Sequence, residues 1–317
     1  MTVALWHNLR VAPVEPELTE RRALGEVLIA AVLFGTTGTV RALGAAAANP
    51  LGVGAARLAI GGAVLIAIAR RAGERIPASI PRGLLVGAGI LTGIYQLAFF
   101  AGLDRAGVAV GTVVTIGSCP PLAGLIAMLA GQGRPTTRWA VATASAVAGV
   151  ALLAGPTGGV DPVGIALALL SALGYAGYTV TVKAIMDRGA PGGAAIAWAF
   201  GIGGFLLLPA LLLTSPGWIV TPGGAVTAVY LGVVPTAVAY VLFVRALGRL
   251  SAATVTTLVL AEPLVATLLG VAVLDERLAV SAIVGCGLVL AGLVVLATAA
   301  QAPRASASGP RRSRVRS

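Results

Sequence analysis

Long apolar runs, separated by short polar or charged segments, fill almost the whole chain. Ten of these runs have about the 17 to 25 residues that an α-helix needs to cross the hydrocarbon core of a bilayer. They cover residues 25–43, 50–69, 83–103, 106–129, 138–154, 161–182, 192–213, 224–245, 251–274 and 279–299. The pattern predicts an all-α integral membrane protein with ten transmembrane helices.

The composition supports a membrane protein without an enzymatic or metal site. Of the 317 residues, 58% are hydrophobic and only 10% are charged, and the 43 glycines suit helices that pack closely in lipid. His7 lies in a polar segment, and Cys119 and Cys286 lie in apolar runs, so the sequence contains no disulfide framework, metal-ligand spacing or hydrolytic motif. We therefore expect no cofactor, no metal and no enzymatic activity.

The distribution of basic residues predicts the orientation. If both termini are cytoplasmic, the 22 Lys and Arg residues all fall on the cytoplasmic side except Arg41, Arg57, Arg105 and Arg277. This bias follows the positive-inside rule for an even number of spans. The third and fourth runs are divided only by Asp104 and Arg105, and a reading with nine or eleven spans would put the termini on opposite sides.

The two ends of the chain are polar. Residues 1–23 form a cytoplasmic segment without the pattern of a signal or transit peptide. Residues 300–317 are rich in Ser, Pro and Arg, and we expect a disordered cytoplasmic tail that contacts anionic lipid rather than nucleic acid, despite the net charge of +11. The Ala, Gly and Arg bias favours a high-GC bacterium, and hence the bacterial plasma (inner) membrane.

The second half of the chain resembles the first at a shift of 141 to 145 residues. The matched pairs are Pro50 with Pro191, Arg57 with Trp198, Pro120 with Pro263, Gly149 with Gly292, Gly87 with Gly232 and Tyr95 with Tyr240. Because each copy holds five spans, an odd number, the copies (24–155 and 160–299) must cross the membrane in opposite directions. Such inverted repeats are typical of secondary transporters, whose site lies at the midplane between the halves.

These features resemble the EamA-type branch of the drug/metabolite transporter superfamily. The resemblance rests on the two five-span units, the Pro–Arg spacing in the second span, the prolines inside the fourth and ninth spans and the acidic helix end Leu274-Asp275-Glu276-Arg277. It implies a ten-helix inner-membrane carrier, usually an exporter of amino acids or other small metabolites, driven by an ion gradient or by exchange. The family's acidic residue after the fourth span is replaced here by Gly131-Gln132-Gly133-Arg134, so Asp275 and Glu276 have either a transport role or only a helix-capping role.

Glu262, followed by Pro263, lies at the middle of the ninth run. An ionised carboxylate near the bilayer midplane costs several kcal/mol unless it is paired or hydrated, and proline removes a backbone donor. We predict a helix kinked at Pro263, with Glu262 facing protein or water. Glu262 would couple proton movement to transport or contact a substrate ammonium group; the alternative is a protonated or salt-bridged packing residue.

Arg57 is the second candidate, about 10 Å below the outer surface by helical rise. It would bind a substrate carboxylate or pair with Glu262; the alternative is a side chain that reaches the outer headgroups. Tyr95 and Tyr240 are expected to line a cavity, while Tyr175, Tyr178 and Trp198 fit a cavity, simple packing or an interface belt equally well. We also predict that Pro120 and Pro121 break the fourth span as Pro263 breaks the ninth.

The leading hypothesis is a secondary transporter that exports a small metabolite, such as an amino acid, across the plasma membrane by alternating access. One alternative is an integral-membrane enzyme acting on a lipid-linked substrate, although Asp104, Asp161 and Asp187 stand apart in the sequence. Another is a non-transporting membrane protein, such as a receptor or assembly partner. The expected partners are a small-molecule substrate and membrane lipid, with no nucleic acid; the sequence predicts no oligomeric state.

Overall fold

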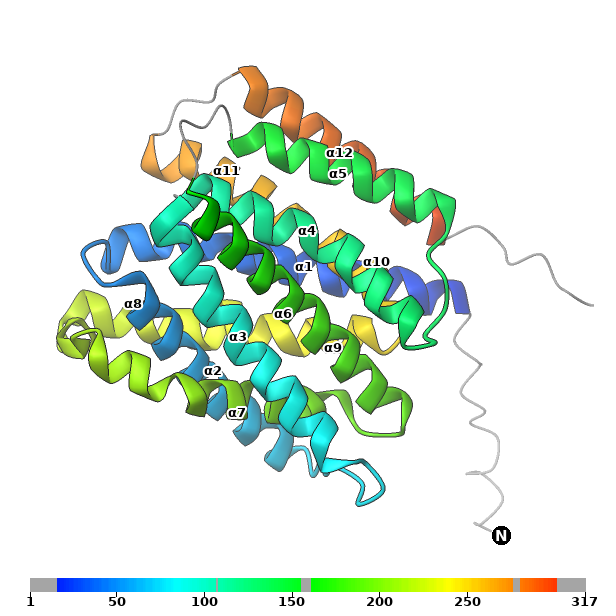
Figure 1. Ribbon diagram of the computed structural model, residues 1–317, viewed down its shortest axis with the longest axis horizontal. Helices are drawn as coiled ribbons and strands as arrows, with labels where there is room; N and C mark the ends of the chain where they lie inside the picture. Colours follow the sequence, from blue (N-terminus) through cyan, green and yellow to red (C-terminus); the bar gives the residue numbers. More distant parts are fainter. Residues whose placement is uncertain (1–15, 107, 155–160, 276–279, 301–317) are drawn as a thin grey trace, which may run out of the picture.

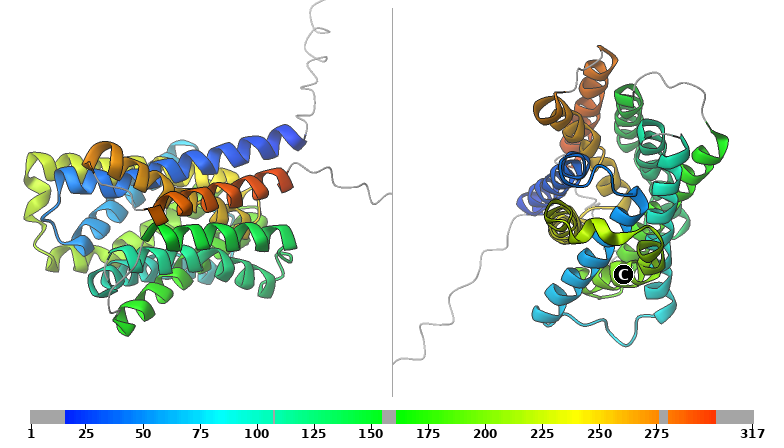
Figure 2. Two further views of the ribbon diagram at one scale, coloured as in Figure 1. Left: turned by 90° about the horizontal axis from the view of Figure 1, so that it is seen from above. Right: turned by 90° about the vertical axis from the view of Figure 1, so that its left-hand side faces the viewer.

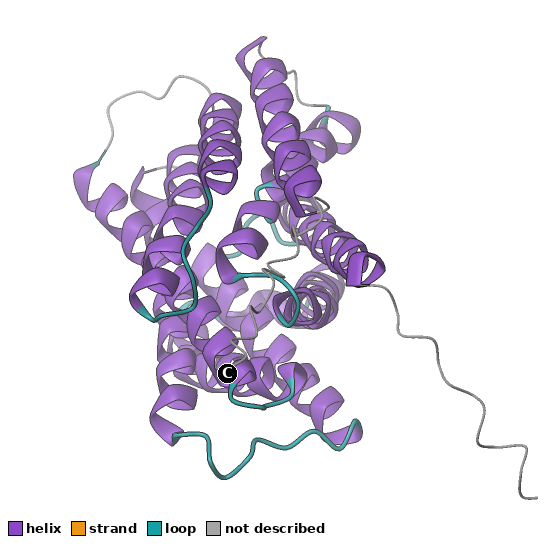
Figure 3. Ribbon diagram, turned by 90° about the vertical axis from the view of Figure 1, so that its right-hand side faces the viewer, coloured by secondary structure: helices purple, strands orange, loops and turns teal. Residues whose placement is uncertain are grey.

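The computed structural model describes residues 16–106, 108–154, 161–275 and 280–300 (Figure 1). Within these ranges the chain forms helices joined by short connections and contains no strand, which confirms the all-α prediction (Figure 3). The predicted tail beyond residue 300, most of the N-terminal segment, Glu276 and Arg277 lie outside the described residues.

The helices follow one another closely along the chain. In order they are α1 (Pro16–Gly44), α2 (Pro50–Arg71), α3 (Arg82–Ala106), α4 (Val108–Leu129), α5 (Thr137–Ala154), α6 (Pro162–Asp187), α7 (Gly192–Leu213), the 3₁₀ helix η1 (Pro216–Val220), α8 (Pro222–Gly232), the π-helical turn η2 (Val233–Val238), α9 (Ala239–Leu247), α10 (Ala252–Leu258), α11 (Ala261–Leu274) and α12 (Val280–Ala300).

Eight helical segments of the described chain are long and apolar enough to cross a membrane. They are Thr19–Gly44, Pro50–Arg71, Arg82–Ala106, Val110–Leu129, Pro162–Asp187, Gly192–Leu213, Pro222–Leu247 and Ala252–Leu274. Two shorter apolar helices, Thr137–Leu152 and Ile283–Leu296, occupy the places of the fifth and tenth predicted spans. The eighth predicted span combines α8, η2 and α9, and the ninth combines α10 and α11.

The two halves of the chain exchange contacts in a regular way. Helices α3 and α4 of the first half pack against α6, which is the first helix of the second half. Helices α9 and α11 of the second half pack against α1, which is the first helix of the first half. Other large contacts join α2 to α7, α3 to α7 and α5 to α12; the last pair lies at one edge of the bundle (Figures 1 and 2). Two repeats related by a two-fold axis would produce this pattern, because each repeat's later helices then meet the first helix of the other.

Polar groups fix helix ends outside the membrane-spanning segments. The carboxylate of Asp161, before α6, accepts hydrogen bonds from the backbone N–H of Val163 at 2.9 Å and from Arg105 at 3.3 Å. The bond from Val163, assisted by Arg105, holds the pKa of Asp161 below its ordinary value. Asp275 ends α11 with a left-handed φ of 54°, which aspartate tolerates better than most residues. This geometry fits the capping alternative for Asp275.

The predicted break of the fourth span is wrong, because α4 continues through Pro120 and Pro121. These prolines lack the N–H groups that would bond to carbonyls one turn earlier. The helix is held from outside instead: α4 packs against α3, α5 and α6, and the Thr115 hydroxyl donates to the Ala168 carbonyl of α6 at 3.0 Å. Packing against the neighbouring helices therefore overrides the tendency of the two prolines to break α4.

The ninth span is interrupted as predicted, but at Val259 and Leu260 rather than at Pro263. At this turn the N–H of Leu260 bonds to the Thr257 carbonyl at 3.0 Å, and that of Glu262 bonds to the Val259 carbonyl at 2.8 Å, each only three residues back. Pro263 then falls in the first turn of α11, where a helix needs no backbone donor. The interruption leaves Glu262 at the N-terminal end of a helix.

Close helix contacts depend on glycine. A Cβ on Gly62 of α2 would lie 2.7 Å from the Phe200 carbonyl oxygen of α7, and one on Gly174 of α6 would lie 2.8 Å from the Tyr95 nitrogen of α3. Both obstacles are backbone atoms, which cannot rotate away. The helix pairs α2–α7 and α3–α6 are therefore as close as they are because these positions carry no side chain.

We predict that Gly62→Ala lowers the thermal unfolding midpoint of the purified protein in detergent, because overpacking of this kind costs about 1 to 3 kcal/mol. The matched control is Gly87→Ala in α3, where an added Cβ meets no atom within 4 Å. The control should be neutral or stabilising, since alanine favours helix over glycine. If Gly62→Ala proves as stable as Gly87→Ala, the close α2–α7 contact is not what holds this pair.

Candidate functional site

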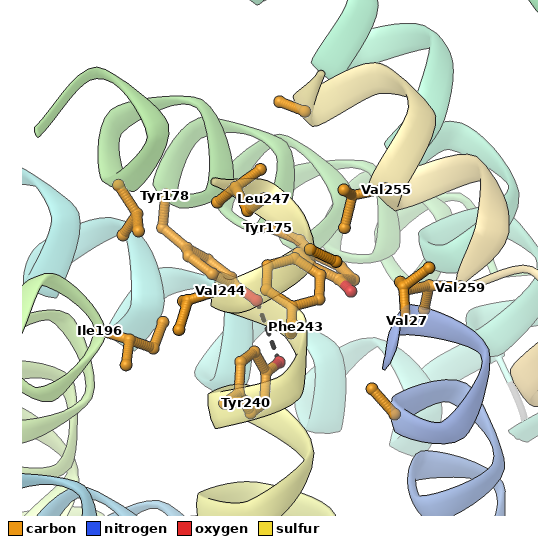
Figure 4. Packing of buried hydrophobic residues seen from close by; sticks show 14 of the residues in the cluster. Val27, Tyr175, Tyr178, Ile196, Tyr240, Phe243, Val244, Leu247, Val255 and Val259 are labelled. Atoms are coloured by element: carbon orange, nitrogen blue, oxygen red, sulfur yellow. Dashed lines mark hydrogen bonds between the residues drawn. The ribbon is translucent and has the colours of Figure 1, made fainter. Parts of the chain in front are cut away.

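Aromatic side chains from both halves of the chain meet in the interior. Tyr175 and Tyr178 of α6 stack with ring centroids 5.3 Å apart and planes at 9°. The Tyr178 hydroxyl donates a hydrogen bond to the Tyr240 hydroxyl of α9 at 3.0 Å (Figure 4). Tyr95 of α3 lies against the same group, with its centroid 5.0 Å from Tyr175 and 6.0 Å from Tyr178. We call Tyr95, Tyr175, Tyr178 and Tyr240 the tyrosine cluster.

Phenylalanines also pack against Tyr240. Its ring centroid lies 4.2 Å from Phe200 of α7, 5.0 Å from Phe34 of α1 and 5.4 Å from Phe243 of α9. Tyr240 is only 2% exposed, so it is not part of an interfacial belt. Tyr175 and Tyr178, which the sequence left open, belong to this buried cluster, whereas Trp198 is 50% exposed and lies outside it.

Arg57 and Glu262 lie near the tyrosine cluster. Both side chains are half-buried. In the part of the chain that the structure describes, no ion pair joins them. The two groups are nevertheless close enough for their charges to influence each other and the ionisation of Tyr95 and Tyr240. The candidate residues Arg57, Glu262, Tyr95 and Tyr240 are thus brought to one region.

The surroundings of Glu262 and Arg57 differ. Glu262 lies in the first turn of α11, where the unpaired N–H groups of a helix end make the surroundings electropositive. The Nε of Arg57 is buried and has no hydrogen-bond partner in the described chain. A buried donor without an acceptor is costly, which marks Arg57 as a group suited to an anionic or carbonyl ligand.

Cys119 borders the same region from α4. It is 2% exposed and belongs to the same buried core as Tyr175 and Tyr240. By the repeat shift of 143 residues, Cys119 is the counterpart of Glu262. The two repeats therefore bring equivalent positions to one place but fill them with a thiol on one side and a carboxyl group on the other.

A π-helical turn beside the cluster was missed by the sequence analysis. In η2, Pro235 has no N–H to donate, and the Leu231 carbonyl accepts instead from the Thr236 hydroxyl at 2.7 Å. The extra residue in this turn changes the direction in which Tyr240, on the next turn, points. The available signal was Pro235 in the middle of the eighth apolar run.

Gln96 is a second missed residue. It follows Tyr95 on α3 and is 1% exposed, yet neither its Oε1 nor its Nε2 has a hydrogen-bond partner in the described chain. An amide carries two donors and two acceptor sites, so leaving all of them unpaired in an apolar interior is unfavourable. The only signal in the sequence was a single amide within an apolar run.

A model of the EamA-like transporter family matches residues 23–155 and 162–298. The uncharacterized transporter YwfM of Bacillus subtilis is 40% identical over 275 residues, which is 86% of this chain and 93% of that protein. An uncharacterized transporter of Clostridium kluyveri is 29% identical over 147 residues, or 45% of this chain and 47% of that protein.

A crystal structure of another protein has the same fold. It superposes with a TM-score of 0.76 at 22% sequence identity, over 88% of this chain and 97% of the other.

We predict that the Tyr178–Tyr240 hydrogen bond makes the two residues energetically coupled. Tyr178→Phe or Tyr240→Phe alone leaves a buried hydroxyl unpaired, at a cost of about 1 to 3 kcal/mol, and the double change should cost less than the sum. The measurement is the free energy of unfolding in detergent of the parent, the two single variants and the double variant. The control is Tyr175→Phe, because the Tyr175 hydroxyl makes no hydrogen bond to another tyrosine hydroxyl in the described chain. This change should leave the free energy of unfolding nearly unaltered. Additive single changes would contradict the coupling.

Proposed function

The chain belongs to the EamA-like transporter family, and from this premise we propose that it is a secondary transporter that exports a small metabolite, such as an amino acid, by alternating access. One observation carries the proposal: Arg57 of the first half and Glu262 of the second half border the same buried tyrosine cluster without forming an ion pair. Two charges kept apart in an apolar interior are suited to a ligand that pairs with both.

The proposed topology has ten transmembrane helices, with α5 and α12 as the fifth and tenth, in a bacterial plasma membrane. Both termini are cytoplasmic, as the distribution of Lys and Arg favours. The exchange of helix contacts between the halves supports two inverted repeats of five helices. The pairing of α5 with α12 supports counting both as spans, since they are equivalent positions of the two repeats.

A zwitterionic substrate fits this site best. The Arg57 guanidinium is permanently charged and binds carboxylates in a planar, two-point geometry. Glu262 supplies the complementary charge for a substrate ammonium group. The faces of the tyrosine rings and the hydroxyls of Tyr178 and Tyr240 offer both apolar and polar contacts to the rest of such a molecule.

Glu262 is also the proposed coupling group. A carboxyl group favours its neutral form in a dry interior and its charged form in water, so its protonation follows the opening of the site to either side. The interruption at Val259 and Leu260 separates α10 from α11, which allows the Glu262 segment to move relative to α10. Only one repeat carries this chemistry, because the counterpart of Glu262 is Cys119.

The alternative of an enzyme acting on a lipid-linked substrate gains no support from the described carboxylates. Asp161 pairs with Arg105 at 3.3 Å and Asp187 with Lys183 at 2.8 Å, so these carboxylates serve surface ion pairs at separate places. Among the described residues, no group of three or more His, Cys, Asp and Glu side chains gathers as a metal site would require.

The test is counterflow into liposomes that contain the purified protein, with a panel of labelled amino acids and an imposed proton gradient. We expect the parent to exchange a substrate. We also expect it to use the imposed proton gradient to accumulate this substrate above its equilibrium concentration. Glu262→Gln should still exchange the substrate, because the amide oxygen of glutamine also accepts a hydrogen bond from an ammonium group. Its accumulation of substrate should fall to the equilibrium level, because glutamine neither binds nor releases a proton.

The matched control is Glu26→Gln, which removes a carboxylate paired with Arg249 at 3.0 Å outside the tyrosine cluster and should behave as the parent does. Full accumulation by Glu262→Gln would rule out coupling through this residue. A parent that exchanges no member of the panel would exclude amino acids as substrates.

A further inference from the structure

A groove of about 580 Å³ lies between the end of α2 and the beginning of α7, apart from the tyrosine cluster. Its apolar walls include Ile66 on α2 and Trp198, Ile202 and Phe205 on α7. Trp198 is 50% and Phe205 is 70% exposed, so these walls lie on the outer surface of the bundle, where a membrane protein meets lipid.

The charged lining of the groove is confined to one end. Arg70 in the last turn of α2, together with Glu74 and Arg75 in the connection that follows, lines this end. Both arginines are exposed, and within the described chain neither forms an ion pair. The groove therefore combines an electropositive end with an apolar remainder.

Glu74 offsets only one of the two arginine charges at this end, and its carboxylate is held at the start of α7. Its Oε2 accepts a hydrogen bond from the backbone N–H of Ala194 in the first turn of α7 at 2.7 Å. A side chain on Gly193 would collide with this carboxylate, so the glycine makes the contact possible. The bond ties the α2–α3 connection to α7 and fixes this end of the groove.

The groove has the length of one lipid leaflet. Its lining on α7 runs from Ala194 to Phe205, which at 1.5 Å per residue is about 16 Å. The hydrocarbon core of a bilayer is about 30 Å thick, so this distance is about half of it. In the proposed orientation the charged end lies at the cytoplasmic headgroups and Phe205 lies near the midplane.

We propose that this groove binds one anionic phospholipid of the cytoplasmic leaflet. The phosphate contacts Arg70 and Arg75, whose two positive charges exceed the single negative charge of Glu74 at this end. An acyl chain lies along Ile66, Trp198, Ile202 and Phe205. The choice of leaflet rests on the proposed orientation; the preference for anionic lipid rests on the groove alone.

Trp198 provides the test, because it forms part of the groove wall. The full chain is reconstituted in phosphatidylcholine vesicles that contain a small, equal mole fraction of either brominated phosphatidylglycerol or brominated phosphatidylcholine. Bromine quenches nearby tryptophan fluorescence, and Trp198→Phe measures the contribution of the other tryptophans. We expect brominated phosphatidylglycerol to quench Trp198 severalfold more strongly than brominated phosphatidylcholine.

The double variant Arg70→Gln/Arg75→Gln should abolish this preference, so that both lipids quench Trp198 equally. The matched control is Arg71→Gln, which removes an exposed arginine adjacent to Arg70 that does not line the groove, and it should keep the preference. Equal quenching in the parent would overturn the proposal, whether or not the variants fold. Loss of the preference in Arg71→Gln would also overturn it, by assigning the effect to general surface charge. None of these readings depends on transport activity.

Discussion

The structure depends on how two charges are kept in an apolar interior. A charged side chain inside a bilayer is tolerated only where protein or water surrounds it. Arg57 and Glu262 meet this requirement through a shared environment of buried tyrosines, without an ion pair between them in the described chain. Several features serve this arrangement: the turn before α11 puts Glu262 at a helix end, η2 redirects Tyr240, and glycines let α2 and α3 approach α7 and α6 closely.

The helices were predictable because each apolar run is long and is bounded by polar or turn-forming residues. For example, the seventh predicted run, 192–213, coincides with α7. Local irregularities were less predictable. The same residue type has three outcomes: Pro120 and Pro121 lie in an uninterrupted helix, Pro235 accompanies a π-helical turn, and Pro263 follows a break. The outcome depends on what supplies the missing hydrogen bond or support, such as the Thr236 hydroxyl or the packing of α4 against α6, and neither can be read from the sequence.

The residues of the candidate site were predictable from the sequence, but their arrangement in space was not. Charged residues and paired tyrosines stand out in apolar runs, so Arg57, Glu262, Tyr95 and Tyr240 could be named in advance. That these four residues lie in one region could not be predicted, because the sequence does not show which faces of helices from opposite halves meet. Gln96 shows the same limit, since an amide becomes notable only when its burial and its lack of partners are known. The two halves match in helix packing but differ in chemistry at the site, as Cys119 opposite Glu262 illustrates.

The most direct measurement of alternating access uses Cys119, which is native to the site. In a Cys286→Ala background, Cys119 becomes the only thiol of the chain, and a membrane-impermeant thiol reagent can be applied to right-side-out and to inverted vesicles. Alternating access predicts that Cys119 reacts from both faces, and that substrate changes the two rates in opposite directions. Reaction from one face only, or from neither, would contradict a site that opens in turn to the two sides of the membrane.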